Sequence, residues 1–292
     1  MARIDGLLRA GFCLSVELWP PRTPQATERL ERSLGRLEAL HPAFASITYG
    51  AAGSTRARTH DLVVRLQREG RITPMAHLTC AAHRRGELVE ILERYAAAGV
   101  DNVLALRGDA PVGAVAPLPD GELTHAVELA ELAKAAGFCV AVAAHPAGHP
   151  DAVSPAHDLD HLAAKLEVAD FAITQFFYAV EEYTRLRDAL GRRGVDKALI
   201  PGIMPITGVR TLERMAQLAG APPPAVLSAR VAALGDDADA VAALGVEVAA
   251  ELGEKLLAEG VPGLHFYTMN QVRSTIAICE ALGLGGGRDA PR

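Results

Sequence analysis

A single carboxylate interrupts an otherwise apolar run near the start of the chain, in the sequence FCLSVELWPPR. The acid is Glu17, and two prolines and an arginine follow almost directly. A carboxylic acid in a partly dry site has a raised pKa and can donate a proton near neutral pH. The alternative is a structural acid that pairs with Arg22 or Arg107. The local sequence leaves both interpretations open.

Other polar residues occur within or directly after apolar runs elsewhere in the chain. Taken alone, Thr48 or His77 is more often a hydrogen-bonded core residue than a ligand contact. A buried amide such as Gln175 is harder to satisfy, because it needs several partners. The recurrence of such residues at one end of several runs favours a common site. The set comprises Glu17, Ser46, Thr48, His77, Thr79, Arg107, Gly108, Asp109 and Gln175.

Four histidines offer a rival chemistry, metal binding. His145 and His149 lie in the Pro/Gly-rich sequence HPAGHP, and His157 and His161 are one helical turn apart. Such spacings can supply metal ligands. However, the sequence contains no HExxH motif, and no nearby carboxylate pattern completes a ligand set. We therefore predict no metal site and treat these histidines as solvated or ligand-contacting.

The elements that must position these residues alternate regularly along the chain. Short apolar runs predict strands, and the segments between them carry apolar residues three and four apart, which predicts helices. Eight strands, each followed by a helix, predict an α/β fold, a (β/α)8 TIM barrel in which residues 1–292 form one catalytic domain. No GxGxxG motif opens a helix after a strand, so a doubly wound sheet is disfavoured. The predicted strands are 12–18, 44–49, 74–79, 102–106, 138–143, 171–176, 199–203 and 263–267.

Barrel geometry predicts where the acid points. Alternate residues of a barrel strand face the interior and the surrounding helices. In the first strand Ser15 and Glu17 share the inward face, which places Glu17 at the C-terminal rim, where TIM-barrel active sites lie. The segment 204–262 holds more helix than one strand–helix unit needs. We therefore expect extra helices between strands seven and eight.

Composition excludes several function classes. The chain of 292 residues has a formal net charge of −6 and lacks a basic cluster with interleaved aromatics, so we expect no nucleic-acid partner. Its apolar runs are shorter than the roughly 18 residues of a membrane span, and no secretory signal is evident. Four widely separated cysteines predict reduced thiols in a cytoplasmic protein.

Eight motifs occur in an order that resembles bacterial methylenetetrahydrofolate reductase. The resemblance covers nearly the whole chain and implies a (β/α)8 barrel that binds FAD non-covalently. It implies reduction of methylenetetrahydrofolate to methyltetrahydrofolate with NADH or NADPH, in ping-pong order, as a methyl supply for methionine synthesis. It also implies a homo-oligomer. The motifs are VELWPPR, SITYGAAGSTRARTHDL, MAHLTC, LALRGDAP, AAHPAGHP, AITQFFY, IPGIMPI and LHFYTMN.

The resemblance implies a role for each matching position. Glu17 matches the catalytic acid, which opens the folate ring by protonating the leaving amine. Asp109 matches an acid that contacts the pterin and tunes the flavin, and Gln175 matches an amide that binds folate. The positions that match FAD contacts are Thr48, His77, Arg107, Gly108, Asp109, His125, Ala143, His145, Asp158, His161 and Lys165.

Several positions depart from the family pattern. His125 and His145 stand where relatives often carry a tyrosine or another aromatic residue, and His161 replaces a common asparagine. Leu18 and Trp19 replace the usual aromatic pair after the acid. These changes surround the expected flavin site, so two alternatives stay open. One is a flavin-free reductase of the same family, and the other is a catalytically silent folate- or flavin-binding barrel.

Overall fold

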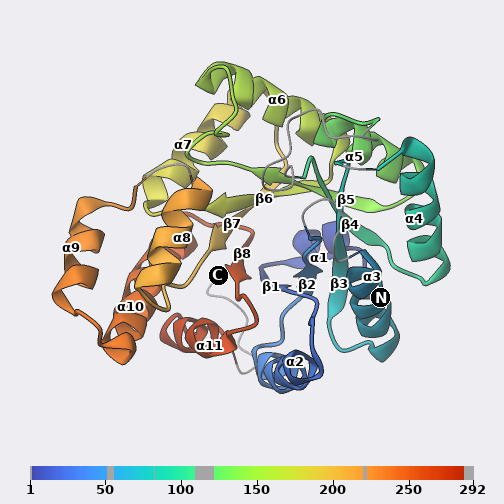
Figure 1. The fold of residues 1–292 in the computed structure, drawn as a ribbon. Helices are drawn as coiled ribbons and strands as arrows, with labels where there is room; N and C mark the ends of the chain where they lie inside the picture. The colour runs from blue at the N-terminus through green and yellow to red at the C-terminus, as the bar shows by residue number, and fades with distance from the viewer. Residues whose placement is uncertain (1, 51–55, 82, 109–121, 220–221, 286–292) are drawn as a thin grey trace.

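The computed structural model describes residues 2–50, 56–81, 83–108, 122–219 and 222–285 (Figure 1). Eight parallel strands pair in chain order, and β8 pairs with β1 to close a barrel. The predicted TIM barrel is therefore confirmed, and each predicted strand is present to within two residues at either end. The strands are β1 (Cys13–Leu18), β2 (Phe44–Ile47), β3 (Thr73–Thr79), β4 (Asn102–Leu106), β5 (Cys139–Ala144), β6 (Phe171–Phe176), β7 (Ala198–Ile203) and β8 (Gly263–Tyr267).

Helices surround this barrel, as Figure 1 shows. Three of the described helices, α2, α6 and α10, begin at a side chain that accepts a hydrogen bond from the first turn. Ser154 accepts a hydrogen bond from the backbone of His157, and Pro155 occupies the first helical position of α6. The helices are α1 (Ile4–Ala10), α2 (Pro24–Leu37), the short η1 (Glu38–Leu40), α3 (Arg56–Glu69), α4 (Arg85–Ala97), α5 (Ala126–Ala135), α6 (Pro155–Val168), α7 (Val180–Gly191), α8 (Val209–Ala219), α9 (Ala225–Ala233), α10 (Ala238–Ala258) and α11 (Val272–Ala281).

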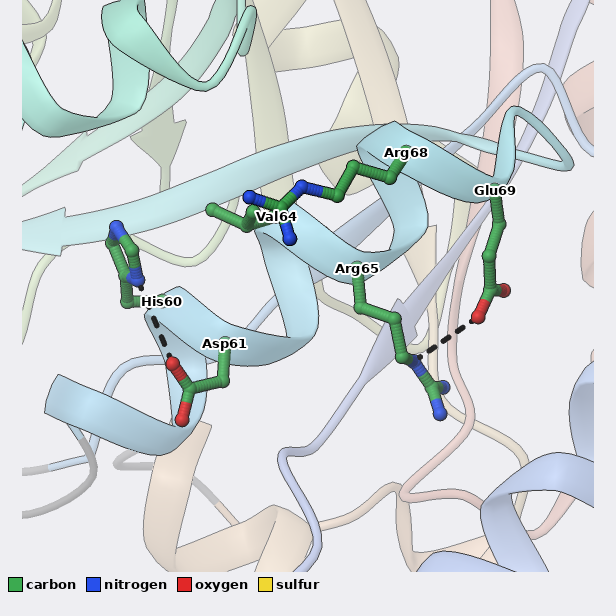
Figure 2. Close-up of a pocket in the computed structure, with 6 residues that line it drawn as sticks. All are labelled: His60, Asp61, Val64, Arg65, Arg68 and Glu69. Atoms are coloured by element: carbon green, nitrogen blue, oxygen red, sulfur yellow. Dashed lines mark ion pairs between the residues drawn. The ribbon is translucent and has the colours of Figure 1, made fainter.

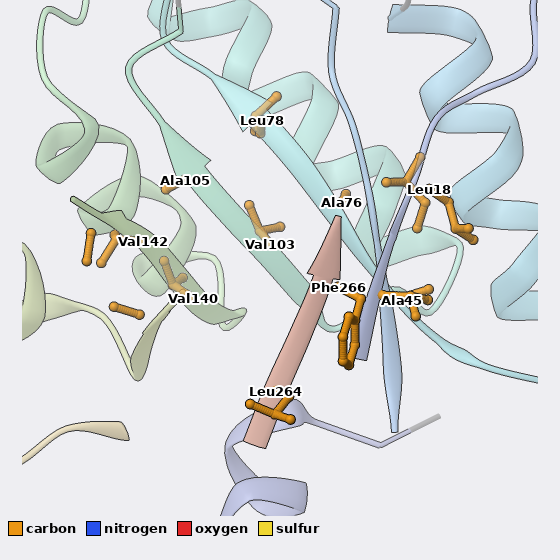
Figure 3. Close-up of a cluster of buried hydrophobic side chains, with 14 of the residues drawn as sticks. Leu18, Ala45, Ala76, Leu78, Val103, Ala105, Val140, Val142, Leu264 and Phe266 are labelled. Atoms are coloured by element: carbon orange, nitrogen blue, oxygen red, sulfur yellow. The ribbon is translucent and has the colours of Figure 1, made fainter. Parts of the chain in front are cut away.

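The main core lies between the strands and the helices (Figure 3). Apart from Thr174 in β6, every second strand residue is apolar and points outward into this layer, and Leu18, Val103 and Phe266 are examples with no exposed surface. Complete burial of one such side chain stabilises the fold by about 1.5–3 kcal/mol. The outward side chains of the strands therefore pack against the helices, and the inward side chains near the C-terminal ends are the ones that can contact a ligand.

A second apolar cluster fills the barrel interior at the N-terminal ends of the strands. Cys13, Phe44 and Phe171 belong to it, and α1 places the fully buried Ile4 in the same cluster. The backbone N–H of Ile4 donates to Oδ1 of Asn102 at 2.9 Å, which fixes α1 to β4. This packed end leaves the C-terminal rim as the open end. The helix α1 was not among the elements predicted from the sequence.

The predicted elaboration between strands seven and eight is confirmed as α8, α9 and α10, which lie together on one side of the barrel in Figure 1. These helices form their own apolar cluster with the end of β6, through Phe176, Met215 and Leu244. Among the described residues, no helix combines the length and apolarity needed to cross a bilayer. All four cysteines are buried and free.

Candidate active site

Glu17 lies one residue before the end of β1, and its side chain is only 13% exposed. Burial raises its pKa to about 7, and a hydrogen bond from Trp19 opposes this shift. Arg107 instead pairs with Asp151 at 2.8 Å. No arginine in the described ranges forms an ion pair with Glu17, so the structural pairing considered for Arg107 is wrong. Near neutral pH, Glu17 is therefore present partly as the acid and partly as the carboxylate.

The side chain of Glu17 lines a hollow of about 190 Å³ at the C-terminal rim. Six different strands or the loops after them contribute to its wall, which shows that residues distant in sequence converge here. Such a concave site with a perturbed acid is the expected form of a small-molecule site. Its polar and small lining residues are Glu17, His77, Ala143, His145, Gln175, His265 and Tyr267.

His77 faces Glu17 across this hollow, with 3.8 Å between its Nε2 and Oε2 of the acid. Burial lowers the pKa of His77 to about 3, so the imidazole is neutral and the contact is not an ion pair. Nε2 of His77 is buried and has no hydrogen-bond partner in the structure. Buried polar atoms are rarely left unpaired, so this nitrogen is free to bind a ligand.

His265 and Tyr267 were not among the predicted site residues, although both line the hollow. His265 is structural, because its ring nitrogens contact Ser15 Oγ at 2.9 Å and Ser46 Oγ at 3.4 Å. The Tyr267 hydroxyl donates to the Thr174 carbonyl at 2.6 Å. Both residues alternate with the outward Leu264 and Phe266, so the parity that predicted the orientation of Glu17 could have identified them.

Gln175 reaches the rim through an irregularity in the sheet. The register between β6 and β7 shifts between Ile173 and Phe176, on either side of Gln175. Such irregularities re-aim side chains next to active sites. The Gln175 side chain lines the same hollow as Glu17, and its Oε1 accepts a hydrogen bond from the Phe176 backbone at 3.1 Å.

A second hollow, of about 210 Å³, lies between α5 and α6. Lys165 connects the two hollows, because it lines this one while its Nζ donates to the carbonyl of Ala143 at 2.7 Å. Burial lowers the pKa of Lys165 to about 8, against the opposing charge of Asp158. The predicted residues that line this second hollow are Arg107, His125, Asp158, His161 and Lys165.

The histidines of the second hollow lie against one another. The rings of His125 and His161 stack with centroids 5.8 Å apart, and Nε2 of His157 lies 3.2 Å from Nε2 of His161. His145 lines the first hollow, and burial together with the neighbouring His149 lowers its pKa to about 4. Across the described residues, no three histidine, cysteine or carboxylate side chains converge as a set of metal ligands.

Two predicted positions, Thr48 and Gly108, line neither of these hollows. Thr48 follows β2 and lines neither hollow; its backbone N–H donates to Leu18 and its carbonyl accepts from Thr59. Gly108 has a φ of +83°, and a Cβ there would lie 2.8 Å from the Cβ of Thr79, so this turn after β4 requires glycine. Asp109 lies outside the described residues.

A larger hollow, of about 480 Å³, lies on the surface of α3 (Figure 2). Its side chains interact with each other: His60 lies 3.7 Å from Asp61, and Arg65 lies 3.5 Å from Glu69. All of its lining residues come from one helix, so it lacks the convergence of the two hollows at the rim. The lining residues are His60, Asp61, Val64, Arg65, Arg68 and Glu69.

Burial of Glu17 makes the stability of the fold depend on pH. Its pKa is about 7 in the folded protein against an ordinary 4.5, so between these values the folded state retains a proton that the unfolded state has lost. Stability therefore falls as pH rises through this window, by up to about 3 kcal/mol. Glu17→Gln should be more stable than the wild type above pH 7 and nearly equal to it below pH 4.5.

Urea unfolding of both proteins across this range measures the difference. His77 and His265 act with the opposite sign, because their folded pKa values of about 3 reduce stability as pH falls below 6.5. Both histidines are present in the variant and the wild type, so their effect cancels. An equal free energy of unfolding at every pH would contradict the raised pKa of Glu17.

Comparison with known proteins identifies the family. A family model described as methylenetetrahydrofolate reductase matches residues 3–283. Two relatives named 5,10-methylenetetrahydrofolate reductase, from Salmonella typhimurium and Escherichia coli, are 35% and 36% identical, and each comparison covers 98% of this chain and 95% of the relative. A relative from Arabidopsis thaliana, named methylenetetrahydrofolate reductase (NADH) 1, is 34% identical over 92% of this chain and 48% of its own length.

A solved structure shares the fold at low sequence identity. It is titled an uncharacterized protein from Clostridium thermocellum that binds two copies of 5-methyl-5,6,7,8-tetrahydrofolic acid, and its TM-score is 0.67 at 14% identity, over 96% of this chain and 98% of that one. At this identity the likeness shows the barrel fold alone. The family model and the curated relatives show that the chain belongs to the methylenetetrahydrofolate reductase family.

Proposed function

We propose that the protein reduces methylenetetrahydrofolate to methyltetrahydrofolate with NADH or NADPH as the reductant. The observation that carries this proposal is the position of Glu17, a buried acid with a pKa near 7 in the wall of the rim hollow. The names of the curated relatives support the same reaction. The plant relative, named as an NADH enzyme, favours NADH.

The proposed role of Glu17 follows from the chemistry of the substrate. A methylene group bridges two folate nitrogens in a five-membered ring, and one C–N bond must break before the carbon can accept hydride. Protonation of the leaving nitrogen by Glu17 breaks that bond and leaves an iminium on the other nitrogen. A positioned general acid contributes about 10²–10⁴-fold to rate. Gln175, in the same hollow, would orient the folate, and Asp109 would contact the pterin.

FAD fits the described residues as the cofactor. The two hollows adjoin through the bond between Lys165 and Ala143, and Lys165 with Arg107 supplies positive charge for the phosphates. The unpartnered Nε2 of His77 would bind a polar edge of the group. The other residues proposed to surround it are Thr48, Gly108, Asp109, His125, His145, Asp158 and His161. When bound, FAD would take hydride from the nicotinamide and deliver it to the folate, which gives the ping-pong order.

The wider setting is proposed on the same basis. The relatives match nearly their full length, which supports a single catalytic barrel over residues 1–292. Four free, buried thiols support a cytoplasmic protein. We also propose a homo-oligomer and a role in supplying methyl groups for methionine synthesis.

The direct test is to incubate the purified protein with methylenetetrahydrofolate and either NADH or NADPH. Oxidation of the nicotinamide should depend on the folate, and methyltetrahydrofolate should be identified by mass. The protein should be yellow from oxidised flavin. A colourless but fully active protein would contradict the FAD proposal and keep the reductase, whereas ligand binding without turnover would identify a silent barrel.

Lys165→Met should weaken FAD binding about tenfold or more, because it removes a charged hydrogen-bond donor where the two hollows meet. Methionine has a similar length and tolerates burial, so the helix should remain in place. Equilibrium dialysis of FAD against the variant and the wild type measures the change. Lys197→Met, at an exposed position before β7, is the matched control. Equal affinities in all three proteins would exclude Lys165 from the cofactor site.

A further inference from the structure

The only tryptophan of the chain contacts the proposed catalytic acid. The indole Nε1 of Trp19 donates a hydrogen bond to Oε1 of Glu17 at 3.2 Å, and Trp19 is 45% exposed. The other carboxylate oxygen, Oε2, faces His77. The two oxygens of Glu17 therefore have different surroundings, a donor at the solvent side and an imidazole toward the barrel interior.

The loop after β8 holds Trp19 in this place. The Asn270 side chain makes two hydrogen bonds to the backbone of Trp19, accepting from its N–H and donating to its carbonyl, both at 2.9 Å. The Thr268 hydroxyl donates to the Glu17 carbonyl at 2.6 Å. Three bonds from one short loop thus fix the backbone of the acid and of its indole partner.

This loop adopts an unfavourable backbone conformation. Met269 and Asn270 have φ values of 46° and 59°, in the left-handed region that residues other than glycine seldom occupy. Each such residue costs about 1 kcal/mol or more, and such strain gathers at functional sites. The Thr268 hydroxyl accepts from the Asn270 N–H at 3.1 Å, and the Ser33 hydroxyl donates to the Asn270 carbonyl at 3.2 Å. These contacts hold the strained loop against β1 and α2.

We propose that Trp19 is a positioning residue that orients the Glu17 carboxyl group and stabilises its ionised form, and so sets the pH at which the acid releases its proton. The hydrogen bond between Trp19 and Glu17 is enough to make the surroundings of the indole depend on the protonation state of Glu17, whatever reaction the protein catalyses. Its effect on turnover rests on the proposed function. Two experiments therefore test these two parts separately.

Among the titratable groups that line the rim hollow, Glu17 is the one with a pKa near neutral pH. Burial lowers the pKa values of the histidines that line this hollow, His77, His145 and His265, to about 3 or 4. It raises the pKa of Tyr267 well above its ordinary value. Burial raises the pKa of Glu17 to about 7, and the indole bond acts against that increase. The titratable groups that face Glu17 are His77 on β3, His145 after β5, and His265 and Tyr267 on β8.

The first experiment follows tryptophan emission against pH in the purified protein without folate. Because the chain has one tryptophan, the emission reports this position alone. A carboxylate and a carboxylic acid perturb a bonded indole differently, so the wild type should show one inflection near pH 7 that Glu17→Gln lacks. Glu254→Gln, at an exposed site on α10, should retain it. No inflection in the wild type, or the same inflection in Glu17→Gln, would overturn the proposal.

The second experiment measures the pH profile of folate reduction in Trp19→Phe. Loss of the indole donor should raise the pKa of Glu17, so the decline in rate should move to higher pH. The rate of flavin reduction by NAD(P)H should show no such displacement, which separates positioning from a general loss of structure. An unmoved profile would overturn the role of Trp19 in turnover. If the wild type does not reduce the folate, the proposed function fails, and the emission titration still decides whether Trp19 senses Glu17.

Discussion

Replacing Glu17 with glutamine should abolish reduction of methylenetetrahydrofolate while leaving oxidation of NADH or NADPH by the proposed flavin close to the wild-type rate. Glutamine retains the shape and the ability to accept the Trp19 bond, but it cannot donate a proton to the leaving nitrogen. Loss of a general acid lowers the rate by about 10²–10⁴-fold. Hydride transfer from a nicotinamide needs no such proton, so only one of the two half-reactions should fail.

Separate stopped-flow measurements of the two half-reactions provide the test. Glu254→Gln makes the same chemical change at an exposed position on α10 and should leave both rates unchanged. Equal losses in both half-reactions of Glu17→Gln would show that Glu17 is structural. The variant should remain folded, because removal of a buried titrating acid increases stability above neutral pH.

Gly202→Ala should destabilise the barrel and impair catalysis together. A Cβ at Gly202 would lie 2.3 Å from the Thr174 carbonyl oxygen and 2.6 Å from a ring carbon of Tyr267. Tyr267 lines the rim hollow, and its hydroxyl bonds the same carbonyl. Overpacking of this kind costs typically about 1–3 kcal/mol and can cost more against backbone. The added methyl group should therefore displace Tyr267 and lower the free energy of unfolding by at least about 2 kcal/mol.

A matched glycine makes this prediction specific. Gly35 is exposed within α2, and a Cβ there would meet no atom within 4 Å. Gly35→Ala should therefore stabilise the protein by about 0.5–1 kcal/mol, through the lower entropy of the unfolded chain. Denaturant unfolding and steady-state rates of both variants give the comparison. Stability of Gly202→Ala within error of the wild type would contradict the close packing of β6, β7 and Tyr267.

Much of the fold could be predicted from periodicity alone. The alternation of Leu14, Val16 and Leu18 with Ser15 and Glu17 identified the inward face of β1, because one face of every barrel strand must pack against helices. The helical excess in 204–262 likewise predicted α8–α10. The helix α1 has only seven residues and includes a glycine, so its sequence carries no clear period. The position of α1 depends on Ile4, which packs into the barrel interior at the N-terminal ends of the strands. Local sequence does not reveal this tertiary contact.

Less of the candidate site could be predicted from the sequence. The inward positions of Glu17, His77 and Gln175 followed from strand parity and the resemblance. The bond of Trp19 to Glu17 depends on Asn270, which lies 251 residues further along the chain and approaches β1 only when β8 closes the barrel. Thr48, which matches a cofactor contact of the family, lines neither hollow, so its assignment rests on the resemblance alone.

The central claim is that Glu17 supplies the proton that opens the folate ring. The most direct measurement is the single-turnover rate of methylenetetrahydrofolate reduction as a function of pH, in the wild type and in Glu17→Gln. The wild-type rate should be constant at low pH and fall about tenfold per pH unit above about 7, because only the protonated acid reacts. The variant should be slow at every pH. A wild-type rate that does not vary across pH 7, or a variant that reacts at the wild-type rate, would contradict the claim.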